Sequence, residues 1–143
     1  MWRHNCWWLF DDPTTILEIG KEHGLDLSSL SLFYYEMFEN EYDADIGDWK
    51  PIEPGNDFFT AVKTPGTKRF SGFDVVTYSL GNAPECSPLS CNMLTQELTV
   101  NQFCLFDEFD RAYSAVDRRV FNDSEPGPYR IIAVYAIDDH GGI

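Results

Sequence analysis

Apolar residues recur at helical spacing near the start of the chain and predict a helix over residues 13–23. Ile16, Leu17 and Ile19 give this segment an apolar side. Pro13 suits the first position of a helix, and Gly24 provides a C-terminal stop. The segment is therefore expected to begin and end where these two residues stand.

Two further segments show the same spacing. Phe106, Phe109, Tyr113, Val116 and Val120 recur at steps of three and four and predict a helix over 107–121. A second helix is predicted over 27–40, where Leu27, Leu30, Phe33 or Tyr34, and Met37 fall at helical spacing. A short helix with Ser90 as its N-cap is predicted over 90–97.

Aromatic and β-branched runs predict the strands. They lie over 72–80, 101–105 and 129–137, while residues 2–10 form a strand or an aromatic arm. Residues 129–137 are apolar at nearly every position, which indicates a central strand covered on both faces. Residues 41–57 combine many acids with glycine and proline and predict an acidic loop.

These elements predict an α+β fold in which three or four helices pack on a small mixed sheet. The length of 143 residues fits a single domain over residues 1–143. Residues 11–57 could form a helical N-terminal subdomain within it.

The charge balance restricts the class of partner. Asp and Glu number 24 against 10 Lys and Arg, a formal net charge of −14. Such a chain is repelled by nucleic acid and by anionic membranes, and it attracts a basic protein. Plain solubility is the alternative meaning of the same charge.

The cysteines and the N-terminus indicate the compartment. No apolar run reaches the roughly 20 residues that span a bilayer, and the aromatic N-terminus lacks a secretory pattern. Cys6, Cys86, Cys91 and Cys104 are therefore expected to be reduced thiols in a cytoplasmic protein. The spacing Cys-x4-Cys-x12-Cys departs from structural zinc sites, and we expect no metal and no cofactor.

Three segments carry a resemblance. They are Asn82 to Asn92 (NAPECSPLSCN), Asn101 to Leu105 (NQFCL) and Glu125 to Ile131 (EPGPYRI). Through them residues 73–135 resemble a group of small uncharacterised bacterial proteins that has no assigned activity. The resemblance implies a bacterial cytosolic origin and carries over no catalytic residue.

One enzymatic alternative remains open at this point. Cys91 in the first turn of a helix capped by Ser90 would have a lowered thiol pKa and could act as a nucleophile, with a histidine as its base. The acidic run Asp43 to Asp48 departs from the EF-hand pattern, and the chain has no phosphate-binding fingerprint.

Acids and aromatics combine over residues 36–57 and predict a surface that binds protein. The predicted contact residues are Glu36, Glu39, Glu41, Tyr42, Asp43, Asp45, Asp48 and Trp49. We expect an inhibitor that is not an enzyme, in its most concrete form a bacterial immunity protein that neutralises a basic toxin such as a nuclease. Alternatives are the Cys91 enzyme, a phage-encoded inhibitor of a host nuclease, and a homo-oligomeric scaffold that uses Trp2, Trp7 and Trp8.

Overall fold

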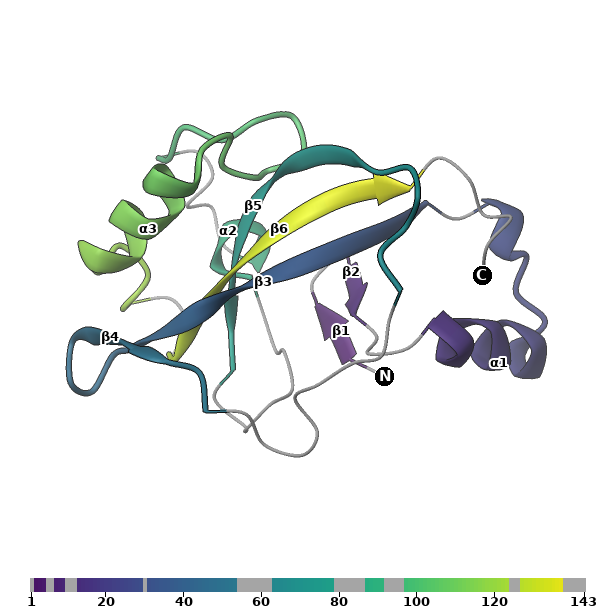
Figure 1. Ribbon diagram of the computed structural model, residues 1–143, viewed down its shortest axis with the longest axis horizontal. Helices are drawn as coiled ribbons and strands as arrows, with labels where there is room; N and C mark the ends of the chain where they lie inside the picture. Colours follow the sequence, from purple (N-terminus) through teal and green to yellow (C-terminus); the bar gives the residue numbers. More distant parts are fainter. Residues whose placement is uncertain are drawn as a thin grey trace.

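A four-stranded antiparallel sheet organises the computed structural model (Figure 1). The structure describes residues 2–4, 7–9, 13–29, 31–53, 63–78, 87–91, 97–123 and 127–137, of which 2–4, 7–9, 13, 29, 90 and 91 by their backbone alone. The strands are β3 (Leu32–Asp43), β4 (Asp48–Pro51), β5 (Arg69–Thr77) and β6 (Tyr129–Ile137), in the spatial order β4-β3-β6-β5.

The other elements are short. β1 (Trp2–His4) and β2 (Trp7–Leu9) pair antiparallel with each other, and α1 (Pro13–His23) is followed by the 3-10 turn η1 (Leu27–Ser29). α2 (Pro88–Cys91) is a single turn, and α3 (Phe109–Asp117) packs against β5 and β6. None of the helices in these described stretches has the length and apolar character needed to cross a membrane.

The predicted mixed sheet with three or four helices is wrong. All described strand pairs of the sheet are antiparallel, and only α1 and α3 exceed one turn among the described helices. The residues assigned to a subdomain over 11–57 contribute α1, β3 and β4. Strands β3 and β4 belong to the same sheet as β5 and β6, and the chain forms a small single domain.

The helix predicted over 27–40 is also wrong, because most of this segment is β3. Tyr34, Glu36 and Phe38 alternate with residues that pack on the other face, such as Tyr35 and Met37. A strand that is apolar on both faces has no polar period to distinguish it from a helix, and its aromatic content favours the strand.

Two smaller predictions between β5 and α3 are also wrong, namely the N-cap at Ser90 and the strand over 101–105. α2 begins at Pro88, and the hydroxyl of Ser87 accepts the N–H of Leu89 at 3.3 Å, so Ser90 does not cap the helix. Residues 101–105 form a turn that the Asn101 side chain stabilises by accepting two backbone N–H groups. Residues 79–86 and 92–96, with parts of the predicted strand and short helix, lie outside the described residues.

The predicted helices over 13–23 and 107–121 are confirmed as α1 and α3, and β6 is confirmed as a central strand. Gly24 ends α1 in the left-handed region, with φ +62°. Phe109, Tyr113 and Val116 of α3 join the main hydrophobic cluster, together with Val75 and Ile131 of the sheet. We call the sheet face that carries this cluster the α3 face.

A bulge in β5 shapes the α3 face. The register with β6 shifts between Phe70 and Gly72, so that Phe70 and Phe73 lie on the same side of the sheet although they are three residues apart. Gly72 has φ +142°, and an added Cβ would lie 2.6 Å from the Cβ of Leu105. Only glycine fits here, and its consequence is an extra aromatic ring on the α3 face.

Candidate functional site

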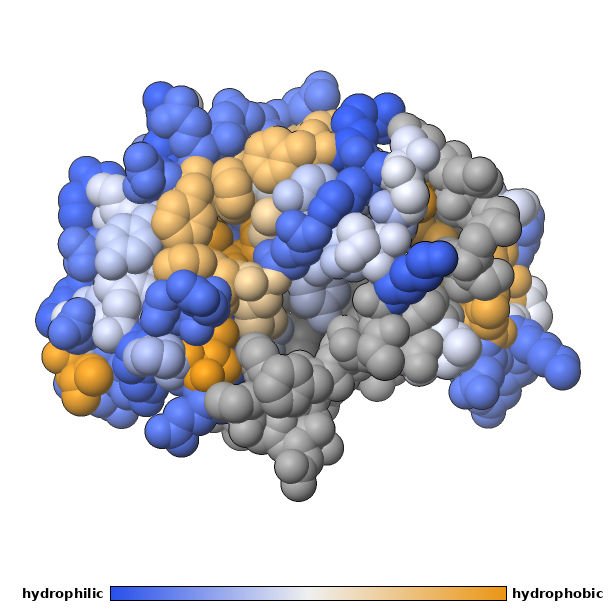
Figure 2. Space-filling model, in the orientation of Figure 1, coloured by the Kyte–Doolittle hydropathy of each residue, from blue (hydrophilic) through white to orange (hydrophobic). Residues whose placement is uncertain are grey.

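Aromatic side chains form a band across the α3 face and are only partly buried. Figure 2 shows apolar residues gathered between α3 and the strands, with hydrophilic residues around them. Phe73 contacts Phe70 at 5.0 Å and Phe109 at 5.7 Å between ring centroids. Phe70 is 45% exposed, although aromatic rings of this size are normally covered in a core.

The band continues onto the hairpin of β3 and β4 through Trp49. The Trp49 indole stacks on Tyr113 of α3 at 4.3 Å, with 11° between the ring planes. It also meets Phe38 and Tyr42 edge to face, at 6.2 and 5.5 Å. The hairpin is therefore attached to α3 through rings, which fixes the position of the acids that it carries.

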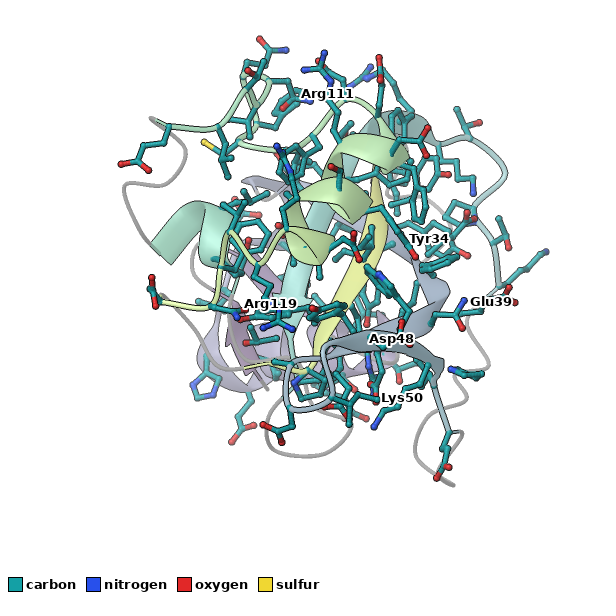
Figure 3. The ribbon with its side chains drawn as sticks, turned by 90° about the vertical axis from the view of Figure 1, so that its left-hand side faces the viewer. Tyr34, Glu39, Asp48, Lys50, Arg111 and Arg119 are labelled. Atoms are coloured by element: carbon teal, nitrogen blue, oxygen red, sulfur yellow. The ribbon has the colours of Figure 1, made fainter. Side chains whose placement is uncertain are left out.

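Carboxylates border this end of the band. Burial and the negative charges of Asp117 and Asp48 together raise the pKa of Tyr113 above its ordinary value. Asp48, Asp117 and Glu39 are exposed, and in Figure 3 Glu39 and Asp48 project from the hairpin side whereas Arg111 lies toward the other end of α3. We call Glu36, Glu39, Asp48 and Asp117 the acidic rim.

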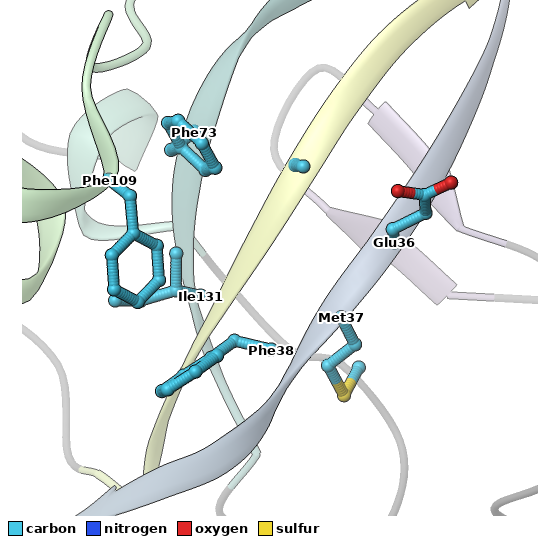
Figure 4. Close-up of a pocket in the computed structure, with 7 residues that line it drawn as sticks. Glu36, Met37, Phe38, Phe73, Phe109 and Ile131 are labelled. Atoms are coloured by element: carbon cyan, nitrogen blue, oxygen red, sulfur yellow. The ribbon is translucent and has the colours of Figure 1, made fainter.

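Between the rings lies a cavity of about 170 Å³. We call it the aromatic groove, lined by Glu36, Met37, Phe38, Phe73, Phe109, Ile131 and Ala133. In Figure 4 the three phenylalanine rings and Ile131 gather around the space between α3 and the sheet, and Glu36 stands farther along β3. Phe38 and Phe109 meet at 4.8 Å and 66°, which makes a corner of the groove rather than a flat wall.

A lysine already occupies the Glu36 end of the α3 face. The Lys68 ammonium forms an ion pair with Glu36 and lies 4.0 Å from the centroid of Tyr135 and 5.0 Å from that of Tyr34. The hydrogen bond to Glu36 is the main cause that raises the pKa of Lys68. This end of the face therefore binds a cation through two tyrosine rings and a carboxylate.

The predicted contact residues differ in their exposure. Glu36, Glu39, Asp45 and Asp48 are exposed, and Trp49 is half-buried in the aromatic band. Tyr42 is 1% exposed within the core. Glu41 is buried and accepts Arg130 Nε at 2.9 Å, with Lys50 Nζ at 3.8 Å from its other oxygen. Glu41 and Tyr42 thus hold the fold together and are not available to a partner.

Asp43 has a local role at the hairpin turn. One carboxylate oxygen accepts the N–H groups of Asp45 and Ile46, at 3.0 and 3.4 Å, and the other accepts Lys50 Nζ at 2.7 Å. The bond from Lys50 is the main cause that lowers the pKa of Asp43. The segment predicted as a loop over 41–57 therefore belongs to the β3–β4 hairpin as far as Pro51, and residues 54–57 lie outside the described part.

Sequence reasoning missed the residues that come from elsewhere in the chain. Phe73 and Phe109 line the groove, Phe70 extends the aromatic band beside Phe73, and Asp117 completes the acidic rim. Helical spacing could have placed two of these residues together. Phe109 and Asp117 are eight positions apart and therefore lie on the same side of a helix. Nothing in the local pattern indicates that the bulge at Gly72 turns Phe70 toward Phe73.

The cysteine chemistry predicted from the sequence is only partly visible. Cys104 is exposed, with φ 58°, whereas Cys6, Cys86 and the side chain of Cys91 lie outside the described residues. Where side chains are described, no three His, Cys, Asp or Glu residues come together to hold a metal ion. The side chains of Trp2, Trp7 and Trp8 likewise lie outside the described set.

Comparison of the chain with family models, with curated proteins and with solved structures finds no match.

Proposed function

We propose that this protein binds a basic protein through the aromatic groove and the acidic rim, and neutralises that protein's activity. One observation carries the proposal. Three phenylalanines from β3, β5 and α3 remain half-buried around an open cavity, whose lining includes the exposed acid Glu36. Aromatic anchors with complementary charges around them are typical of protein interfaces.

Charge explains why the partner is basic. The chain carries a net charge of −14. In the described stretch 97–123, which includes α3, the Lys and Arg residues are Arg111, Arg118 and Arg119. The exposed carboxylates of Glu39, Asp48 and Asp117 at the rim would accelerate association with a cationic surface and would repel nucleic acid. A nuclease toxin fits this description, because its own active site is built to attract phosphate. An immunity protein of this kind would cover that site with carboxylates.

The rings explain why the complex would be held after the first encounter. Charges at a rim act mainly on the rate of association, whereas buried anchors slow dissociation. Phe70 and its neighbour Phe73 expose apolar surface on the part of the α3 face that α3 does not cover. A partner that covers them removes that surface from water, which stabilises the complex.

The experiment begins with affinity capture from the source cells, followed by purification of each captured protein. The proposal expects a basic protein that forms a defined complex with the purified chain and loses its own activity as the chain is titrated to equivalence. Phe73→Ser should weaken this complex at least tenfold, while Leu17→Ser, an exposed position on α1, should leave it unchanged. A partner that binds both variants equally, or keeps its activity when bound, would overturn the proposal.

A further inference from the structure

The aromatic groove has the size of one side chain. Its volume of about 170 Å³ is well below the roughly 300 Å³ at which pockets for cofactors and other small molecules begin. Its walls come from β3, β5 and β6 of the antiparallel sheet and from α3. A groove of this size suits an anchoring side chain of a protein partner.

The chemistry of the lining points to a cation. Phe38, Phe73 and Phe109 present ring faces and edges at steep angles to one another, with 66° and 76° between neighbouring planes. Glu36 adds a carboxylate that is 43% exposed. A long side chain with a cationic end can pack its methylene stem on such rings and direct its charge toward the carboxylate.

The chain itself contains a second, independent indication. Lys68 binds at the Glu36 end of the same face by the same means, with its ammonium over two tyrosine rings and paired with Glu36. Glu36 is also 3.3 Å from the hydroxyl of Tyr135. A carboxylate has about four acceptor positions, so a further donor can share Glu36 with these two.

We infer that the aromatic groove binds an arginine side chain of the basic partner, with the guanidinium against the phenylalanine rings and Glu36 as its acceptor. Arginine suits the groove better than lysine because a planar guanidinium stacks on rings and is weakly hydrated. The ammonium of lysine is a compact, strongly hydrated charge that cannot stack on the rings, so it loses more bound water on entering the groove. This inference rests on the proposed function, since it names the anchor of that partner.

The test uses the full chain and three probes that need no partner: the N-acetyl N-methylamides of arginine, lysine and norleucine. Each is titrated while the ring signals of Phe38, Phe73 and Phe109 are followed by NMR. The arginine probe should shift these signals saturably and bind at least fivefold more tightly than norleucine and more tightly than lysine. Glu36→Gln should weaken arginine binding at least threefold, and Glu22→Gln on α1 should not.

The outcomes separate the two proposals. Equal or tighter binding of norleucine, shifts that avoid the three rings, or an unchanged affinity in Glu36→Gln would each overturn the arginine inference. Phe109→Leu provides a second variant that keeps the groove apolar, and it should also weaken arginine binding. Failure of the probes leaves partner neutralisation to be judged by its own experiment, and failure of that experiment leaves the probe result standing.

Discussion

Trp49 stacks on Tyr113 at 4.3 Å and thereby joins the β3–β4 hairpin to α3. The two residues are far apart in sequence, and Asp48 of the hairpin and Asp117 of the helix both act on the phenol of Tyr113 at this contact. The acidic rim therefore depends on an aromatic contact beneath it. Loss of that contact should affect both stability and the position of the rim.

Replacement of Trp49 tests this dependence. Trp49→Ala should lower the free energy of unfolding by about 3 kcal/mol, because it removes a ring packed on three others. Trp49→Phe should cost less than half as much, since the buried Nε1 donor of Trp49 has no hydrogen-bond partner in the described structure. Urea unfolding measures both. Equal losses in the two variants would show that the ring contacts contribute little.

The buried pair of Glu41 and Arg130 gives a second prediction. Their charged groups are 2.9 Å apart, with side chains 11% and 5% exposed, and Arg130 also lies 4.0 Å from the ring of Tyr78. Arg130→Met should destabilise the fold by about 3 kcal/mol, because it leaves Glu41 buried with only Lys50 at longer range.

The double variant Glu41→Leu with Arg130→Met is the control for this pair. It should recover most of the lost stability in urea unfolding, because no unpaired charge remains. A double variant as unstable as Arg130→Met alone would mean that packing, and not the unpaired charge, causes the loss.

Tyr113 makes stability depend on pH at the alkaline end. Its pKa is raised from the ordinary value of 10.0 by burial, then by Asp117 and Asp48, so the folded state holds the phenol proton more tightly than the unfolded state. The contribution to stability is complete below about pH 10 and is lost as pH rises through the folded pKa. Asp48→Asn should lower the pKa of Tyr113.

This shift is measured by following the Tyr113 ring carbons in an NMR titration. Glu22→Gln changes the net charge by the same amount on α1 and should leave the pKa of Tyr113 where it is. An equal shift in both variants would indicate a general charge effect and not the proximity of Asp48.

Phe70 separates stability from binding. It is 45% exposed and touches Phe73 and Tyr135 edge to face. Phe70→Ala should change the free energy of unfolding by less than about 1 kcal/mol, yet weaken binding of the purified partner at least tenfold, as for an interface anchor. Leu17→Ala, 41% exposed on α1, is the matched control in calorimetry. An unchanged partner affinity in Phe70→Ala would show that the surface around Phe70 is not part of the interface.

The sequence predicts an element correctly where its apolar residues fit only one spacing, either that of a helix or that of a strand. The steps of three and four in α3 have a polar side, so the pattern had no competing assignment. In β3 both faces are apolar, and helical and strand periods fit the same residues. The acids around Tyr42 and Trp49 favour a loop in the sequence pattern. In the structure these residues belong to two paired strands, and the turn between them contains Gly47 with φ +70°.

The candidate site could be predicted only in its local part. Glu36, Glu39 and Asp48 are close in sequence, and all three are exposed. The groove depends on the register of β5 with β6 and on the packing of α3, which are contacts between distant segments. Burial of Glu41 depends on Arg130, which is 89 residues away, and the local sequence does not predict that pair.

The most direct test of the central claim is the association rate constant of the purified basic partner, measured at low and at high ionic strength. The double variant Asp48→Asn with Asp117→Asn removes two of the four carboxylates of the acidic rim. The control, Glu18→Gln with Glu22→Gln, removes two exposed acids of α1 at the other end of the molecule (Figure 1). The account predicts association about fivefold slower at low salt for the rim variant, a smaller difference at high salt, and little change for the α1 variant. Equal rates for the two variants would contradict it.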